Sequence, residues 1–220
     1  MPAASTSSSK TQGVAATLRI AAFHRLFGEL HTWRISDDLR VLAAAKGSAL
    51  VLPFVKGLRL SAQLIYMLRT ELSGTGLEVD WGHLLDDQGA SCSPECDIII
   101  HRRGHVEQWN GTSQPVMDFK FVRRELAVAV VSCKSHLNGV DAEYVRKMRR
   151  YVRRVFLFAE CCAPNKVLSL QKKAKKAGYA GFGYLYTFDE KTSQCVSDEK
   201  GWLAFLDTVA SKVRRAARRN

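Results

Sequence analysis

The sequence predicts an α/β fold: a mixed central sheet flanked by helices, with an N-terminal helical extension. Two observations predict it. Apolar residues recur at helical spacing through the first third of the chain, and short β-branched segments then alternate with helical ones. Of the 220 residues, 46% are hydrophobic and 25% are charged, which is enough for a normal core and excludes wholesale disorder.

The first third is expected to be helical. Residues 1–13 are rich in Ser and Ala without an apolar stretch, so we expect a disordered N-terminus and no signal peptide. Residues 14–74 are expected to form the helical N-terminal part. Within it, helices are predicted over 14–33, over 36–47 and, after Pro53, up to residue 72.

Residues 75–190 are expected to form the α/β core, and residues 191–220 a C-terminal basic helix, all within one compact unit. Strands are predicted over 77–85, 96–101, 119–122, 126–132, 155–159 and 181–188. Helices are predicted after Asp141, with an apolar seam reaching Val155, and over 169–177, closed by Gly178.

The charge balance favours a polyanionic partner. Thirty-three Lys and Arg against 21 Asp and Glu leave a net charge of +12. The basic residues are concentrated in three runs, Arg146–Arg154, Lys172–Lys176 and Lys212–Arg219. Each run alone is also compatible with a solvated helix face, and the last two with a localisation signal or a solubilising tail.

Several classes are disfavoured. No apolar run approaches the roughly 18 residues of a membrane span, so no membrane partner is expected. The six cysteines include no pair of CxxC motifs, which argues against structural zinc and fits a reducing compartment. A cytoplasmic protein is therefore expected.

The chemistry-bearing residues lie on two predicted strands. Asp97 stands at the head of one strand, and Ser132 and Lys134 stand at the end of another. Side chains two residues apart on a strand point to the same side, so Ser132 and Lys134 share a site that a neighbouring strand can bring to Asp97. This set suits metal-assisted phosphodiester hydrolysis: the acid holds Mg²⁺ and the lysine orients or deprotonates the attacking water.

The pattern resembles the PD-(D/E)xK nucleases, of which restriction endonucleases are the largest group. The resemblance rests on SCSPECDIIIHRRG and FKFVRRELAVAVVSCKSHL, followed by helix–strand–helix–strand, and covers about residues 77–188. It implies a restriction-endonuclease-like fold. It also implies a prokaryotic, Mg²⁺-dependent DNA endonuclease of the restriction or anti-phage defence type.

The chain departs from the family pattern at two positions. Cys96 replaces the usual proline before the first acid, and Ser132 replaces the acid two residues before the lysine. One branch of the family has the same Ser-x-Lys arrangement and supplies the carboxylate from the following helix. The resemblance therefore implies Asp97 and Glu143 as metal ligands, with Lys134 acting on water. Glu143 as a surface partner of Lys147 is the alternative.

Other acids are alternatives to this assignment. Asp118 and Lys120 form a literal D-x-K, which ranks lower because its flanking stretch is polar. Glu71, Glu78 and Asp80 precede the first catalytic strand, and each is a candidate auxiliary ligand.

The basic runs would then contact backbone phosphates of double-stranded DNA. The residues assigned to this role are Arg146, Lys147, Arg149, Arg150, Arg153, Lys172 and Lys173. A homodimer or higher homo-oligomer is expected, because cutting both strands needs two active sites. Two alternatives stay open: a catalytically inactive nucleic-acid-binding subunit with the same fold, and a basic protein that binds proteins or membranes.

Overall fold

Eight strands form one mixed sheet in the part of the chain that the structure describes, in the order β3-β4-β1-β2-β5-β6-β7-β8. The structure is a computed structural model and describes residues 17, 19–25, 27–28, 48–104, 106–109, 119–189, 191–192 and 194–218. The strands are β1 (Leu77–Leu85), β2 (Cys96–Arg102), β3 (Val106–Trp109), β4 (Phe119–Arg123), β5 (Ala127–Leu137), β6 (Val155–Cys162), β7 (Gly181–Asp189) and β8 (Gln194–Ser197). Strands β5, β6 and β7 are parallel, as are β1 and β4, whereas β2 runs antiparallel to both of its neighbours.

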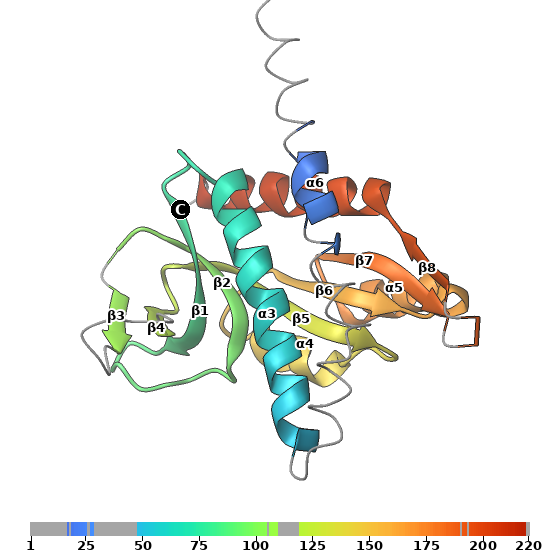
Figure 1. The fold of residues 1–220 in the computed structure, drawn as a ribbon. Helices are drawn as coiled ribbons and strands as arrows, with labels where there is room; N and C mark the ends of the chain where they lie inside the picture. The colour runs from blue at the N-terminus through green and yellow to red at the C-terminus, as the bar shows by residue number, and fades with distance from the viewer. Residues whose placement is uncertain are drawn as a thin grey trace, which may run out of the picture.

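Helices cover both faces of the sheet (Figure 1). The long helix α3 (Ser48–Glu71) and the C-terminal helix α6 (Glu199–Ala217) share one apolar core with one face of the sheet. Helices α4 (Ala142–Met148) and α5 (Val167–Ala177) share a second core with the opposite face. A 3₁₀ turn (Pro164–Lys166) leads into α5.

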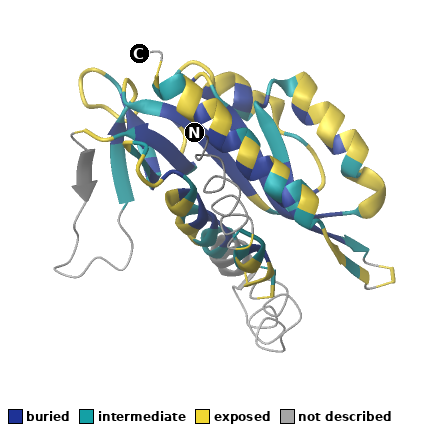
Figure 2. Cartoon of the chain, turned by 90° about the horizontal axis from the view of Figure 1, so that it is seen from above, coloured by how far each residue is buried: buried dark blue, intermediate teal, exposed yellow. Residues whose placement is uncertain are grey.

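The central strands are the most deeply buried elements, as Figure 2 shows. Every residue of β6 is buried, and so is the middle of β5. A strand buried on both faces reads as a continuous apolar run, which is why these two were recognisable in the sequence. On α6, buried and exposed residues alternate at helical spacing, as expected for a helix that packs one side onto a sheet.

The observed elements confirm all six predicted strands, and three differences stand out. Strands β3 and β8 were not predicted, because each is only four residues long. Helix α3 begins at Ser48 and runs through Pro53, ahead of the predicted start. The expected disordered stretch 1–13 and the helix over 36–47 lie outside the described residues.

The third difference concerns the helix after Asp141. It was predicted to carry an apolar seam to Val155, but α4 ends at Met148. The backbone N–H groups of Tyr151 and Val152 both bond to the Met148 carbonyl, which closes the chain into a turn before β6 begins. The basic run Arg146–Arg154 is therefore divided between a short helix and the connection that follows it.

Candidate active site

Asp97 lies at an irregularity in the sheet. In the pairing of β1 with β2, Asp80 stands opposite Ile99 and Gly82 opposite Cys96, so Asp97 and Ile98 form a bulge. Bulges re-aim side chains and are common beside active sites. On its other side β2 pairs with β5, in unbroken register from Ile98 opposite Val131 to Ile100 opposite Ala129, before a shift at His101. This register brings Asp97 to the part of β5 that holds Ser132 and Lys134.

Asp97, Ser132 and Lys134 lie close together, as the alternation of side chains along the two strands led us to expect. The Asp97 Oδ2 atom accepts a hydrogen bond from the backbone N–H of Cys133, at 2.8 Å. Burial raises the pKa of Asp97, while the Cys133 bond, the Lys134 charge and the Ser132 hydroxyl each lower it, and burial prevails. Ser132 is buried, at 1% exposure, whereas Lys134 is exposed. The lysine side chain is therefore accessible from solvent on the strand next to the carboxylate.

Glu143 is turned to solvent. The Asp141 side chain accepts a hydrogen bond from the Tyr144 backbone N–H at 2.9 Å and so caps the start of α4. This start places Val145 and Met148 toward the core and leaves Glu143 exposed. The Glu143 carboxylate forms an ion pair with Lys147 at 3.0 Å, one turn along the helix. Its role as a metal ligand stays a prediction.

Tyr144 and Glu95 were not selected from the sequence, yet both are coupled electrostatically to Asp97. The Tyr144 hydroxyl is buried and has no hydrogen-bond partner among the described residues. Burial raises the pKa of Tyr144 well above its usual range, and the Asp97 charge adds to the effect. The Glu95 charge in turn raises the pKa of Asp97. Tyr144 had been assigned to the apolar seam, which accounts for its ring but not for its hydroxyl.

The donor set around Asp97 fits Mg²⁺. Magnesium in phosphoryl-transfer sites is typically held by one or two carboxylates together with substrate phosphates, and it keeps several waters. Asp97 supplies one half-buried carboxylate whose raised pKa reflects the cost of its buried charge, and a cation would offset that cost. The buried Tyr144 hydroxyl has no hydrogen-bond partner among the described residues and can donate to a buried water.

Six of the seven assigned DNA-binding residues lie on or just after the helices that cover the Asp97 side of the sheet. They are exposed and comprise Arg146 and Lys147 on α4, Arg149 and Arg150 in the following turn, and Lys172 and Lys173 on α5. Arg153 is different, because it lines a pocket at the end of the sheet where β5 begins. In the alternative D-x-K motif, Lys120 lies on β4 and Asp118 lies outside the described residues.

The candidate auxiliary acids have other partners. The Glu71 carboxylate accepts two bonds from the Arg19 guanidinium, at 2.5 and 2.6 Å. Glu78, Asp80 and His101 form a cluster whose ligand atoms all lie within 4.8 Å of one another. His101 is four residues beyond Asp97 on β2, so this cluster is separate from the Asp97 site.

The Asp80 and His101 side chains are already hydrogen-bonded to other protein groups. His101 Nε2 lies 2.9 Å from Asp80 Oδ2, and its Nδ1 lies 2.8 Å from the Arg102 carbonyl oxygen. Arg69 donates to the other Asp80 oxygen at 2.7 Å. The bonds from His101 and the charge of Arg69 lower the pKa of Asp80 despite its burial. A metal ion would have to displace these bonds, so we assign the cluster a structural role.

Replacing Asp80 by asparagine is expected to destabilise the fold by about 3 kcal/mol at pH 7, because breaking a buried ion pair leaves its partner uncompensated. Asp80 and His101 side chains are 9% and 0% exposed. Since the folded-state pKa of Asp80 is lowered, its contribution is present above about pH 4 and is lost as the pH falls further. Urea unfolding of the parent and variant across pH 3–7 measures this.

The control is Asp207→Asn. Asp207 pairs with Arg19 at 2.7 Å but its side chain is 64% exposed, so its loss should cost no more than about 1 kcal/mol. Equal losses in the two variants would contradict the structural role of the buried cluster.

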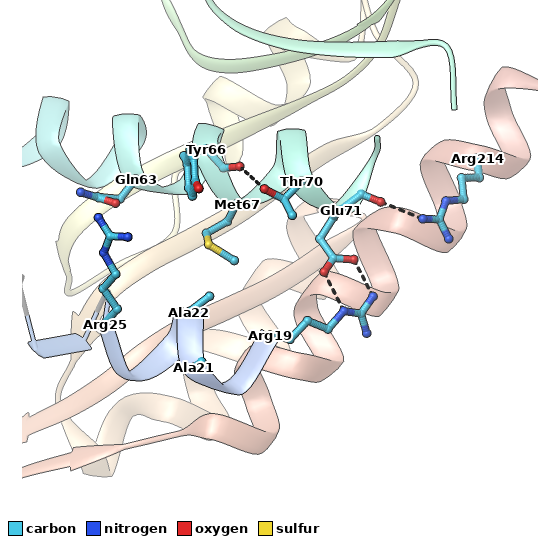
Figure 3. Close-up of a pocket in the computed structure, with 10 residues that line it drawn as sticks. All are labelled: Arg19, Ala21, Ala22, Arg25, Gln63, Tyr66, Met67, Thr70, Glu71 and Arg214. Atoms are coloured by element: carbon cyan, nitrogen blue, oxygen red, sulfur yellow. Dashed lines mark hydrogen bonds and ion pairs between the residues drawn. The ribbon is translucent and has the colours of Figure 1, made fainter. Parts of the chain in front are cut away.

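A separate cavity of about 580 Å³ lies between the N-terminal helical residues and α3, with a contribution from α6. Figure 3 shows Arg25, Gln63 and Tyr66 around one part of it, and Arg19 bonded to Glu71 at the other. The Tyr66 residue is 62% exposed, which is unusual for a large aromatic residue. The volume falls within the range of small-molecule sites.

Comparisons with known proteins identify structural relatives only. No protein-family model matches the chain, and no curated protein matches it. NucC of P. aeruginosa ATCC27853 in its cAAA-bound form superposes with a TM-score of 0.60 at 14% identity, over 91% of each chain. The cAAA-bound NucC of E. coli MS115-1 gives 0.57 at 15% identity, over 98% of this chain and 93% of the other. The chain has a restriction-endonuclease-like α/β fold.

The apo form of the E. coli protein gives a lower TM-score, 0.50, at 15% identity over 88% of this chain and 92% of that one. At these identities the likeness concerns the fold alone. Within the described residues, none of the helices combines the length and the apolarity that crossing a bilayer requires.

Proposed function

We propose that the protein is a Mg²⁺-dependent DNA endonuclease of the restriction or anti-phage defence type. The observation that carries the proposal is the meeting of Asp97, Ser132 and Lys134 at one bulge of a sheet with this fold. A half-buried carboxylate beside an exposed lysine is an arrangement that suits phosphodiester hydrolysis.

Each side chain of the candidate active site would have its own role in hydrolysis. Asp97 would hold Mg²⁺, which when bound offsets the negative charge that develops on the phosphate. Lys134 would orient the attacking water or take its proton, and Ser132 would line the site. The Tyr144 hydroxyl, which lacks a partner among the described residues, would donate to a phosphate oxygen or a water.

Because the motif has the form Ser-x-Lys, the second metal-binding carboxylate has to come from another residue. We propose Glu143 for this role, and it would have to leave its exposed ion pair with Lys147, whose worth is at most about 1 kcal/mol. The exposed basic residues of α4 and α5 would contact the backbone of double-stranded DNA, and a homodimer or higher homo-oligomer would present two sites to the two strands.

A second candidate is an inactive nucleic-acid-binding subunit. Its support is the serine at position 132, where the family pattern has an acid, together with the solvent-facing Glu143. It predicts salt-sensitive DNA binding without metal-dependent cleavage.

The 580 Å³ cavity suggests a form of regulation. Two of the structural relatives hold cAAA, and we propose that this cavity takes a ligand of that class. The exposed Tyr66 ring offers a surface for stacking a base, and Arg25 lines the same cavity.

The test is incubation of the purified full chain with supercoiled plasmid and with genomic DNA, with and without Mg²⁺, and with and without cAAA. We expect metal-dependent cleavage. Discrete fragments would indicate a sequence-specific enzyme, and a smear a non-specific one. Stimulation by cAAA that Tyr66→Ala removes would support the regulatory cavity. A salt-sensitive gel shift with no cleavage in any of these conditions would overturn the proposed endonuclease activity and favour the binding subunit.

A further inference from the structure

A second basic site lies at the end of the sheet where β2 finishes and β5 and β6 begin. It is a pocket of about 220 Å³. We call it the arginine pocket and define it by Arg102, Arg124, Glu125, Tyr151, Arg153 and Arg154. These residues come from three segments that are distant in sequence: the end of β2, the turn between β4 and β5, and the connection from α4 to β6.

The arginine pocket is separate from the candidate active site. Asp97 and Arg102 lie five residues apart along β2. At a strand rise of about 3.3 Å per residue, their backbones are roughly 17 Å apart. A group bound in the arginine pocket is therefore not the phosphate beside Asp97 and Lys134.

The charges in the pocket are poorly balanced. Its lining residues include four arginines and one acidic residue, Glu125. Arg124 bonds to Asp87, a residue that does not line the pocket, with its Nε 3.1 Å from Asp87 Oδ1. Arg102 donates only to the Glu125 carbonyl oxygen, at 3.4 Å. Among the described residues, neither Arg102 nor the Arg153–Arg154 pair forms a salt bridge.

Burial makes this imbalance costly. Arg102, Arg154 and Tyr151 are all half-buried rather than solvated at the surface. Bringing like charges together away from water disfavours folding unless an anion compensates them. The basic C-terminal run approaches the same end of the sheet, because Ala216 of α6 also lines the pocket. A neighbouring hollow is lined by Arg214, Arg215 and Arg218.

We propose that the arginine pocket binds a phosphate group, held by the guanidinium groups of Arg102, Arg153 and Arg154. Planar guanidinium forks match the oxygens of phosphate and bind them in pairs. The Tyr151 side chain in the pocket adds a possible hydroxyl donor. The phosphate comes either from a free ligand, such as a nucleotide, or from the DNA backbone about half a helical turn from the cleavage site.

The first arm of the test uses inorganic pyrophosphate on the full chain, without Mg²⁺ so that metal chelation plays no part. Sodium chloride at matched ionic strength serves as the reference. Saturating pyrophosphate is expected to raise the melting temperature by at least about 3 °C, because a ligand that binds only the folded state stabilises it. Arg102→Gln and Arg153→Gln should each remove most of this shift.

The control is Arg103→Gln. Arg103 is adjacent in sequence and carries the same charge, but it pairs with Glu78 at 3.1 Å and does not line the pocket. Its variant should keep the full pyrophosphate shift. Arg153 is exposed, so Arg153→Gln should fold even if Arg102→Gln does not.

The second arm separates the two sources of phosphate. DNA affinity is measured against salt concentration in EDTA for the same variants. A DNA-backbone contact predicts weaker binding in Arg153→Gln and a salt slope smaller by about one. Unchanged DNA binding with a lost pyrophosphate shift identifies a free phosphate ligand. If neither quantity differs from that of Arg103→Gln, the proposal is wrong. The pyrophosphate arm involves no cleavage, so its result is independent of the proposed nuclease activity.

Discussion

Replacing Lys134 by alanine is expected to lower the rate of Mg²⁺-dependent DNA cleavage at least about a hundredfold, while DNA affinity stays within about threefold. A positioned proton-transfer group typically contributes a factor of about 10² to 10⁴. Lys134 is exposed on β5 and its charge acts on Asp97, so it would stand near a metal held by Asp97. The rate is measured on supercoiled plasmid and the affinity by gel shift in EDTA.

Lys134→Arg separates the two roles that a lysine can have. Arginine keeps the positive charge but is not deprotonated at accessible pH. If Lys134 only orients water and stabilises charge, the arginine variant should retain much of the activity. If it takes a proton, the arginine variant should be as slow as the alanine variant.

Lys200→Ala is the matched control for Lys134→Ala. Lys200 is exposed near the start of α6, which packs on the sheet face opposite α4 and α5. Its removal changes the net charge equally and should leave the cleavage rate unchanged. Cleavage by Lys134→Ala at the parental rate would show that Lys134 has no part in the reaction.

Asp97→Asn is expected to abolish Mg²⁺ binding at this site, and cleavage with it, without destabilising the fold. Burial raises the pKa of Asp97, which means that its ionised form is disfavoured in the folded protein. The neutral amide removes that cost, so the free energy of unfolding at pH 7 should stay equal to that of the parent or rise. Asp80→Asn, in the separate Asp80–His101 cluster, should behave in the opposite way because the pKa of Asp80 is lowered.

The raised pKa also predicts how the parent responds to pH. Only the ionised carboxylate binds the metal, so cleavage should fall as the pH is lowered toward the raised pKa of Asp97. A higher Mg²⁺ concentration competes with the proton and should shift the profile to lower pH. Rates between about pH 5 and 8 at two Mg²⁺ concentrations, with calorimetric Mg²⁺ titration, measure this.

A pH profile that does not move with Mg²⁺ would show that Asp97 is not the ligand. Loss of stability in Asp97→Asn as large as in Asp80→Asn would show that Asp97 is a structural residue.

The meeting of Asp97 with Ser132 and Lys134 was predictable because it depends on strand periodicity and on one pair of neighbouring strands. Both strands have strong local signals, a β-branched run in β2 and a continuous apolar run in β5. The bulge that turns Asp97 toward Ser132 was not predictable, since it arises from the different pairing of β2 with its two neighbours.

Helix phase was the feature that the sequence left least determined. The resemblance implied Glu143 as a metal ligand, which stays a prediction; the Asp141 cap starts α4 so that Glu143 is exposed in this structure and the Tyr144 hydroxyl is buried. A shift of one residue on a helix turns a side chain by about 100°, and sequence spacing does not resolve it. The same short helix separates Arg153 from the arginines that precede it.

The sequence by itself determined the order of strands and helices, the basic character, and the pair of strands that carry Asp97 and Lys134. These properties follow from local periodicity and composition, which each segment carries on its own. Only the tertiary structure decided which groups meet across the sheet: the Asp80–His101 pair, the bond from the Cys133 backbone to Asp97, and the arginine pocket. Such contacts join residues distant in sequence, and they depend on register, helix phase and chain reversals that are set by packing of the whole domain.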